Sequence, residues 1–440
     1  MLLRAPKPSR AGRRRSLTDT AQSTTRPELI DSLVRDRPDE SDEPADRLVI
    51  AYCFTPYVDT SGTVMAKRVR LLGEPVDVIQ NEMSTIRGID PGVEAVAGDL
   101  IRRRAILPTQ TRFSSWPSIR EWCEAGEAKV DQWVADSGGT APWRSMYSRS
   151  HFVASHYLAA LVKGKHPEIQ WEAEFSDPCS RDANGAVRFA PVEHDDLLRR
   201  VRSIVGPLEV EPDVENVFAW AEHLVWSRAD RIIFTNENQL EYMIGLIPDP
   251  QLRGRARERA VVAHHPMLPP RFYELDRADQ ELESDRINIG YFGNFYGKQS
   301  PVDVVRGISA LDKDLRRRLA LHIYTNDTEK LDEYIEALDV ADCVRAHPFL
   351  PFLQFLEIST RMDLLLVIDY PLAKDAEKNP FLLSKWGDYE GSGTPVWGLL
   401  EESSVLSAMN HDAIRFRTPI QQPTAAAQLL SRLARGVITI

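Results

Sequence analysis

The chain has 440 residues, of which 43% are hydrophobic and 8% aromatic, as is typical of a globular protein that buries a full core. It contains 54 Lys and Arg residues and 65 Asp and Glu residues, which gives a formal net charge of −11. This acidic balance argues against a general nucleic-acid-binding protein. The four cysteines lack the paired spacing of a disulfide framework or a zinc site, and no apolar run approaches the roughly 18 residues of a membrane span. With no apolar signal segment near the start, these features predict a cytoplasmic protein of about two or three domains.

Residues 1–46 differ in composition from the rest and are predicted to form a disordered tail. A basic head with Arg13, Arg14 and Arg15 is followed by an acidic, proline-containing stretch, and aromatic residues are absent. The arginines could contact anionic lipid, because basic segments are attracted to anionic membrane surfaces. A solvated tail and a peripheral membrane contact therefore both stay open.

The first folded region, residues 47–272, alternates strand and helix signals. The apolar run 47–54 reads as a buried strand, and a loop and a helix lead from it to a short strand at 76–79. That order is a βαβ unit, whose crossover should be right-handed. The Trp- and Arg-rich region 90–150 shows no clear pattern beyond helices around Ile119–Val134. The alternation predicts a parallel, Rossmann-like first domain. Its further predicted elements are strands at 169–175, 231–235 and 259–263 and helices at about 150–163, 214–229 and 236–247.

The acidic segment 273–286 lacks strand signals and is the predicted linker, after which the alternation restarts. A second Rossmann-like domain is therefore expected over residues 287–422, followed by a C-terminal helical segment, 423–440, that could pack on either domain. The predicted fold class is α/β, with two doubly wound Rossmann-like domains facing each other across a cleft. The predicted strands of the second domain are 287–292, 319–324, 344–349, 364–368 and 396–400.

A charged segment after the fourth predicted strand of the second domain carries the first candidate site. The pattern predicts a helix from Phe381 to Tyr389 that would hold Ser384, Lys385 and Asp388, with Pro380 suited to its first turn. Open α/β sheets bind their ligands at the carboxyl ends of the strands. At that edge, a lysine could bind a phosphate and a carboxylate could accept a hydrogen bond from a sugar hydroxyl, which would suit a sugar nucleotide. An ordinary helix N-terminus with surface charges is the alternative.

A glycine-containing loop after the strand at 287–292 is the second candidate. Gly293 and Asn294 follow the strand, and Lys298 comes shortly before a predicted helix. Backbone N–H groups, a helix N-terminus and a lysine could therefore meet a diphosphate there. The loop has neither P-loop spacing nor the three-glycine dinucleotide fingerprint, so an ordinary β–α turn is the alternative.

In the first domain, several polar residues follow strands or lie near helix starts. Gly62 would let the backbone approach a ligand closely, and His151 and His156 lie on or just before a helix. For any one histidine, a structural role is the alternative. No histidine or carboxylate pair has a spacing typical of a metal site, and no Gly-x-Ser-x-Gly nucleophile elbow occurs. Asp177 and the His264–His265 pair follow other predicted strands.

Four segments together resemble glycosyltransferases of the GT-B fold, in the style of family 4, over residues 47–434. The most specific is Ser384-Lys-Trp-Gly-Asp-Tyr-Glu-Gly-Ser-Gly-Thr-Pro395, which is similar to a Ser-Lys variant of the family's Glu-x7-Glu motif. The others resemble the glycine loop of the donor domain, the strand before the donor motif and the last part of the acceptor domain. These three are Tyr291-Phe-Gly-Asn-Phe-Tyr-Gly-Lys298, Met362-Asp-Leu-Leu-Leu-Val-Ile-Asp369 and Ala229-Asp-Arg-Ile-Ile-Phe-Thr-Asn-Glu237.

The resemblance implies roles for individual residues. Gly293 and Lys298 would contact the donor diphosphate, and Lys385 would lie near the phosphates or the donor sugar. Asp388 would accept hydrogen bonds from the nucleotide ribose, while Gly62 matches the glycine loop of the first domain. The expected donor-binding set is Gly62, Gly293, Asn294, Lys298, Ser384, Lys385, Asp388 and Tyr389.

Two positions leave alternatives open. Pro380 occupies the place where the family's first glutamate would contact the sugar, and Glu377 or Asp375 could replace that contact from the preceding loop. Either His156 or His151 would match the family's active-site histidine. The expected catalytic set is His156, His151, Lys298 and Lys385.

The resemblance implies a transferase that moves a sugar from a nucleoside diphosphate sugar to an acceptor hydroxyl. The reaction would retain the anomeric configuration and need no metal ion or other cofactor. Expected partners are the nucleotide sugar and a cell-surface glycan or glycolipid acceptor. A sugar-nucleotide epimerase or hydrolase is one alternative, and Pro380 keeps open a second, a non-catalytic protein that binds sugar nucleotide.

Overall fold

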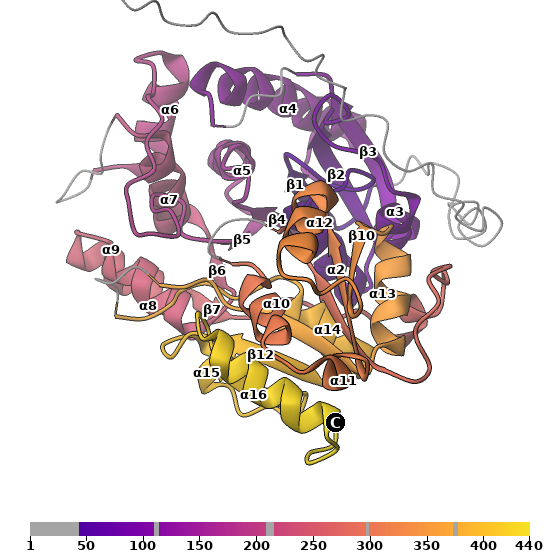
Figure 1. The fold of residues 1–440 in the computed structure, drawn as a ribbon. Helices are drawn as coiled ribbons and strands as arrows, with labels where there is room; N and C mark the ends of the chain where they lie inside the picture. The colour runs from indigo at the N-terminus through magenta and orange to yellow at the C-terminus, as the bar shows by residue number, and fades with distance from the viewer. Residues whose placement is uncertain (1–43, 110–113, 208–214, 296–298, 373–376) are drawn as a thin grey trace, which may run out of the picture.

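The computed structural model describes residues 44–109, 114–207, 215–295, 299–372 and 377–440. The predicted tail, 1–46, therefore lies almost entirely outside the described residues. The chain folds into two α/β units, each built on a parallel β-sheet with helices packed on it. In Figure 1 the indigo-to-pink part of the chain forms the first unit and the orange-to-yellow part forms the second.

The first unit contains a seven-stranded sheet with strand order β3-β2-β1-β4-β5-β6-β7, and every neighbouring pair is parallel. Its central strands are buried, which explains why they read as continuous apolar runs. The strands are β1 (Arg47–Ala51), β2 (Val76–Asn81), β3 (Ile101–Leu107), β4 (Ser145–Arg149), β5 (Gln170–Glu174), β6 (Arg231–Phe234) and β7 (Ala260–Val262).

Several helices of the first unit begin at polar caps and bury apolar side chains. Asp59, Asn236 and Asp249 each accept backbone N–H groups of the first turn, as expected of N-cap residues. The elements are α2 (Thr60–Leu72), α3 (Pro91–Ala97), η1 (Gly98–Leu100), α4 (Trp116–Asp136), α5 (Ala154–Lys165), α6 (Asp196–Val205), α7 (Val217–Arg228), α8 (Glu237–Gly245), α9 (Pro250–Glu258) and η2 (Pro270–Tyr273).

The second unit contains a six-stranded parallel sheet with strand order β10-β9-β8-β11-β12-β13. Residues 274–286, which connect the two units, contain no helix or strand. The strands are β8 (Ile287–Phe292), β9 (Leu319–Thr325), β10 (Val344–Pro348), β11 (Leu364–Ile368), β12 (Val396–Leu400) and β13 (Ile414–Pro419). The helices are α10 (Val302–Ser309), α11 (Lys313–Arg316), α12 (Thr328–Ala337), α13 (Phe352–Arg361), α14 (Trp386–Ser392), α15 (Val405–Ala408) and α16 (Pro423–Ala434).

Strands β3 and β4 lie in the region that the sequence pattern left unassigned. Strand β3 contains three consecutive arginines, which mask its strand character. In the folded protein, Arg103 donates to Asp77 across the sheet and its guanidinium lies 4.6 Å from the centre of the Trp133 ring. Arg104 forms an ion pair with Glu94 at 2.8 Å. Partners distant in sequence therefore stabilise this strand.

The helix predicted to begin at Phe381 begins instead at Trp386, so the predicted start was wrong. The reason is that the carbonyls before it have partners outside any helix. Pro380 O accepts from Asn236 Nδ2 at 3.0 Å, and Leu382 O accepts from His265 Nε2 at 3.0 Å. Both donors belong to the first unit, which holds this loop in a non-helical form.

The C-terminal helix α16 packs on α10 of the second unit, which answers the question that the sequence left open. Gly307 of α10 makes this approach close, because a Cβ there would lie 3.0 Å from the backbone N of Ala427. In the described part of the chain, no helix is long and apolar enough to cross a membrane.

Candidate functional site

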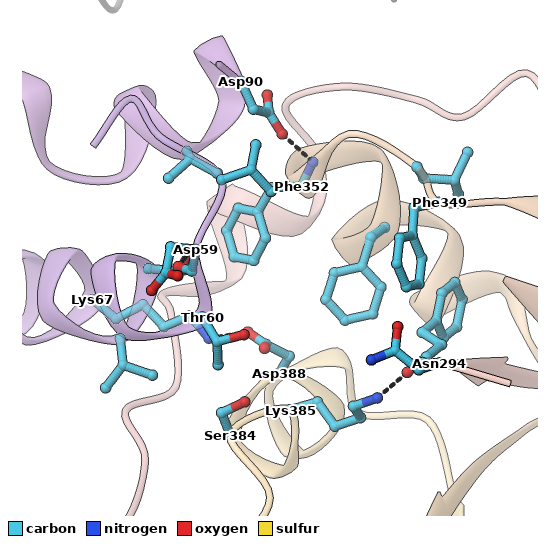
Figure 2. Close-up of a pocket in the computed structure, with 18 of the residues that line it drawn as sticks. Asp59, Thr60, Lys67, Asp90, Asn294, Phe349, Phe352, Ser384, Lys385 and Asp388 are labelled. Atoms are coloured by element: carbon cyan, nitrogen blue, oxygen red, sulfur yellow. Dashed lines mark hydrogen bonds and ion pairs between the residues drawn. The ribbon is translucent and has the colours of Figure 1, made fainter. Parts of the chain in front are cut away.

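A cleft with a volume of about 930 Å³ lies between the two units. Its walls come from the segments that follow β1, β2, β8, β10 and β11 and from the start of α14. These segments stand at the carboxyl ends of parallel strands, where ligands of open α/β sheets bind. The lining residues include Asp59, Lys67 and Asp90 from the first unit and Asn294, Phe349, Phe352, Ser384, Lys385 and Asp388 from the second (Figure 2).

Lys385 lies at the floor of the cleft, half-buried, immediately before α14. Its Nζ donates to the carbonyl of Phe292 at the end of β8 and lies 5.4 Å from the centre of the Tyr291 ring. Burial lowers the pKa of Lys385 to about 8, because removal from water disfavours the ammonium, while the nearby Asp388 acts in the opposite direction. The site thus holds a cation whose pKa lies below that of an exposed lysine.

Gly293 is the residue that gives Lys385 this position. A Cβ at Gly293 would lie 2.6 Å from Lys385 Nζ and 2.8 Å from the Tyr291 hydroxyl, closer than real Cβ contacts allow. A larger residue here would push the ammonium or the Tyr291 hydroxyl away from its present position. The predicted loop glycine and the predicted lysine meet at one point, although they are 92 positions apart in the sequence.

Asp388, in the first turn of α14, forms an ion pair with Lys67 of α2 at 2.5 Å. Both side chains are almost fully buried, with 1% of Lys67 and 5% of Asp388 exposed. Burial raises the pKa of Asp388, and the positive charges of Lys67 and Lys385 oppose that shift. The backbone carbonyl of Asp388 accepts a hydrogen bond from the Tyr273 hydroxyl at 3.0 Å. A charged pair from two different units thus closes one side of the cleft.

Lys67 was missed by the sequence analysis. It lies three positions after Val64 and two before Val69, on the helix face that packs into the interior. A single lysine within an apolar helical stripe was the available signal, because an ammonium at such a position needs a partner. The sequence does not indicate that the partner is Asp388.

An aromatic wall, also missed, faces the polar floor. Phe349, 46% exposed, and Phe352 and Phe355 line the cleft beside Phe292, whose ring centre lies 4.8 Å from that of Phe355. Asp90 of the first unit accepts the backbone N–H of Phe352 at 2.7 Å and thereby fixes the start of α13. Figure 2 shows the rings of Phe349 and Phe352 above Lys67, Lys385 and Asp388, with Asp90 on the far side of Phe352, so an aromatic layer faces the charged floor.

Gly62 does not line the cleft. A Cβ at this position would lie 3.2 Å from the Cys53 carbonyl, so the glycine allows α2 to pack closely on the end of β1. Asp59 caps this helix by accepting the N–H groups of Ser61 and Gly62, and its other oxygen pairs with Arg87 at 3.0 Å. The N-terminus of α2 is therefore occupied by a side chain of the chain itself.

The two candidate histidines lie in different environments. His156 is fully buried, packs on Trp171 and Phe175, and its Nδ1 lies 2.9 Å from the Ser148 hydroxyl. Burial lowers its pKa to about 3, so the ring is neutral. His151 is half-buried beside Phe152, and burial also lowers its pKa. Neither histidine belongs to the cleft lining, and the catalytic role of each stays a prediction.

The remaining predicted residues divide into three groups. Asn294 and Ser384 line the cleft with Lys385 and Asp388, although Ser384 lies in the turn before α14 rather than on the helix. Tyr389 lies behind the cleft wall, where its buried hydroxyl accepts the backbone N–H of Phe292 at 3.3 Å. Lys298 and Asp375 lie outside the described residues, and Glu377 is exposed and does not line the cleft.

The other predicted polar residues have positions outside the cleft lining. Asp177 is half-buried, His264 is exposed, and His265 is buried against the loop before α14. Within the described ranges, no group of three or more His, Cys, Asp and Glu side chains is arranged to hold a metal ion.

No protein-family model and no curated protein matches the chain. Several solved structures resemble it over most of its length. Anabaena Alr3699/HepE in complex with UDP-glucose has a TM-score of 0.52 at 11% identity, over 89% of this chain and 90% of that one. The catalytic domain of Arabidopsis thaliana starch synthase IV, bound to ADP and acarbose, has a TM-score of 0.53 at 11% identity, over 90% and 96%. Sucrose-phosphate synthase from Thermosynechococcus elongatus has a TM-score of 0.51 at 10% identity, over 88% and 89%.

At these identities the likeness concerns the fold. The predicted fold class is confirmed: two doubly wound Rossmann-like units face each other across a cleft in the GT-B arrangement.

Proposed function

We propose that this chain is a glycosyltransferase that moves a sugar from a nucleoside diphosphate sugar to an acceptor hydroxyl. The observation that carries the proposal is the pairing, in one interdomain cleft, of a lysine and a carboxylate at a strand edge with an aromatic wall. Structures of the same fold support it, since one was solved with UDP-glucose and another with ADP and acarbose.

The two halves of the cleft suit the two ends of a nucleotide. A diphosphate would lie at Gly293, Asn294 and Lys385, where a half-buried ammonium offsets its negative charge. The ribose would reach Asp388, and the base would contact the wall that includes Phe352, because planar rings stack well on aromatic side chains. The volume of about 930 Å³ leaves room for a sugar and part of an acceptor.

In the proposed reaction, the bond between the anomeric carbon and the diphosphate oxygen breaks and the acceptor oxygen bonds to that carbon. Negative charge develops on the departing diphosphate, so Lys385 would stabilise the transition state more than the ground state. We propose retention of configuration, in which the acceptor hydroxyl enters on the side of the leaving group and passes its proton to the diphosphate. In this proposal, side chains of the protein stabilise the charge on the diphosphate, and the reaction needs no metal ion or other cofactor.

The proposed acceptor is a glycan or glycolipid of the cell surface, modified on the cytoplasmic side. Val58 and Phe349, one from each unit, are about half exposed and line the cleft. Apolar residues in such positions would accommodate the apolar faces of sugar rings or a lipid-linked acceptor.

A ligand panel tests the proposal. UDP-, GDP-, dTDP- and ADP-sugars would be added to the purified protein, and thermal unfolding followed by fluorescence. One nucleotide class should raise the melting temperature, since a ligand at 100 times its dissociation constant stabilises by about 2.7 kcal/mol. Product analysis should then find free nucleoside diphosphate only when an acceptor is added. No shift with any nucleotide would contradict the proposal, and binding without turnover would favour a non-catalytic protein.

The pH dependence of nucleotide affinity follows from Lys385. The diphosphate should bind the protonated form, so affinity is full below the pKa of about 8 and falls as pH rises through it. If the neutral form does not bind, affinity at pH 9 should be about tenfold lower than at pH 7. Calorimetric titrations at both pH values measure this ratio. The Lys385→Arg variant should show a flat profile because arginine stays charged; a sloping profile for that variant would assign the effect to another group.

A further inference from the structure

We propose that Lys67, contributed by the first unit, is a positioning residue for the nucleotide bound mainly by the second unit. Its ion pair holds the Asp388 carboxylate in place as a hydrogen-bond acceptor and links ribose binding to the contact between the two units. This inference rests on the proposed function and adds a residue from the opposite side of the cleft to the donor site.

The hydrogen bonding of the Asp388 carboxylate supports this role. Lys67 Nζ bonds Asp388 Oδ1 at 2.5 Å, and in the described part of the chain no side chain or backbone N–H is hydrogen-bonded to Oδ2. Asp388 lines the cleft, so in the proposed complex a ligand hydroxyl would approach this second oxygen. A carboxylate oriented by one partner, with one oxygen left over, suits a vicinal diol such as that of ribose.

The burial of the Lys67–Asp388 pair supports it as well. A carboxylate that is 5% exposed would tend to take up a proton if it stood alone, and a protonated carboxyl is a poorer acceptor of two hydroxyl hydrogen bonds. Lys67 opposes that protonation. Lys67 is itself 1% exposed and lies 5.5 Å from the centre of the Phe352 ring, so it cannot swing freely into solvent.

The pair also connects the two units. Lys67 belongs to α2 and Asp388 to α14, and Asp90 reaches from the first unit to the backbone of Phe352 at the other end of the same cleft. Near the pair, Lys385 precedes α14, the Tyr273 hydroxyl donates to the Asp388 carbonyl, and the neutral His265 lies within electrostatic range of Lys67, Arg149 and Glu174. Loss of the Lys67 charge should therefore alter both the acceptor at Asp388 and the contact of the units.

Titration calorimetry with UDP, ADP, GDP and dTDP tests the role. Lys67→Met should weaken binding of the best nucleotide at least tenfold at pH 7, and Lys67→Arg should restore most of the affinity. The ratio of wild-type to Lys67→Met affinity should shrink as pH rises, because burial raises the pKa of Asp388 and the carboxyl of the variant ionises only at higher pH. An affinity ratio that stays constant with pH would overturn the inference.

Two further measurements distinguish a role of Lys67 in orienting Asp388 from a role in the stability of the fold alone. Removing one partner leaves the other charge buried alone, so in thermal unfolding the Lys67→Met/Asp388→Asn double variant should lose less stability than the sum of the single variants. The control is Lys313→Met, which breaks an exposed ion pair with Asp339 and should leave affinity unchanged. A lower melting temperature of Lys67→Met with wild-type affinity would overturn the inference and leave the proposed function intact. Wild-type protein that binds none of the four nucleotides would overturn both.

Discussion

Replacing Lys385 by alanine is expected to lower turnover by about a hundredfold or more and to remove measurable nucleotide binding. Loss of one preorganised group that stabilises transition-state charge costs about 100- to 1000-fold in turnover in other enzymes. Here, the ammonium is held beside the β8 carbonyl by a glycine that leaves just enough room for it. No other described cation has this position at the cleft floor.

The fold should survive this substitution, because Lys385 is half-buried and its hydrogen bond is made to a backbone carbonyl at a strand end. Circular dichroism and the melting temperature would check that point beside the activity assay. The matched control is Lys378→Ala, seven positions earlier on an exposed part of the same segment, which should behave as wild type. Activity of Lys385→Ala within threefold of wild type would contradict the placement of the diphosphate.

The largest expected effect on stability comes from Gly387→Ala. A Cβ at Gly387 would lie 2.8 Å from the His265 carbonyl oxygen and 2.9 Å from that of Pro266. Both obstacles are backbone atoms, which cannot turn aside as a side chain could, so α14 must shift. Overpacking of this kind costs about 1–3 kcal/mol. Because Asp388 is the next residue, nucleotide affinity should fall as well.

Denaturant and thermal unfolding of Gly387→Ala measure this cost, with calorimetry for the affinity. Gly254→Ala is a suitable control, since Gly254 is exposed in the middle of α9 and a Cβ there would meet nothing within 4 Å. That variant should be more stable by about 1 kcal/mol, as alanine is the better helix former. If both variants unfold at the same denaturant concentration, the close approach at Gly387 does not constrain the fold.

The predictability of the fold differed between the two units. In the second unit, β8, β11 and β12 coincide with the predicted apolar runs, because strands buried on both faces carry continuous apolar sequence. In the first unit, β3 escaped prediction because its arginines are polar in the sequence and become paired only on folding. Strand β13 was missed as well, and it carries exposed and half-buried positions at the sheet edge.

The sequence predicted where the candidate site lies but only some of the residues that form it. Gly293, Lys385 and Asp388 could be proposed from the sequence because each follows a recognisable strand, and strand ends in a parallel sheet gather at one edge. Lys67 could not, since it sits inside a helix and its partner is 321 positions away. His156 was proposed from its residue type, and its burial among aromatic rings is a property of the packed core.

The sequence by itself determined the alternation of strands and helices, the two α/β units and the edge at which a ligand would bind. These features depend on local periodicity and on the apolar character of buried strands, which each segment carries on its own. The tertiary structure decided which charges meet across the cleft, where α14 begins and which histidine is excluded from solvent. Those outcomes depend on the partners that the packing of the two units brings to each side chain, and a segment taken alone carries no record of them.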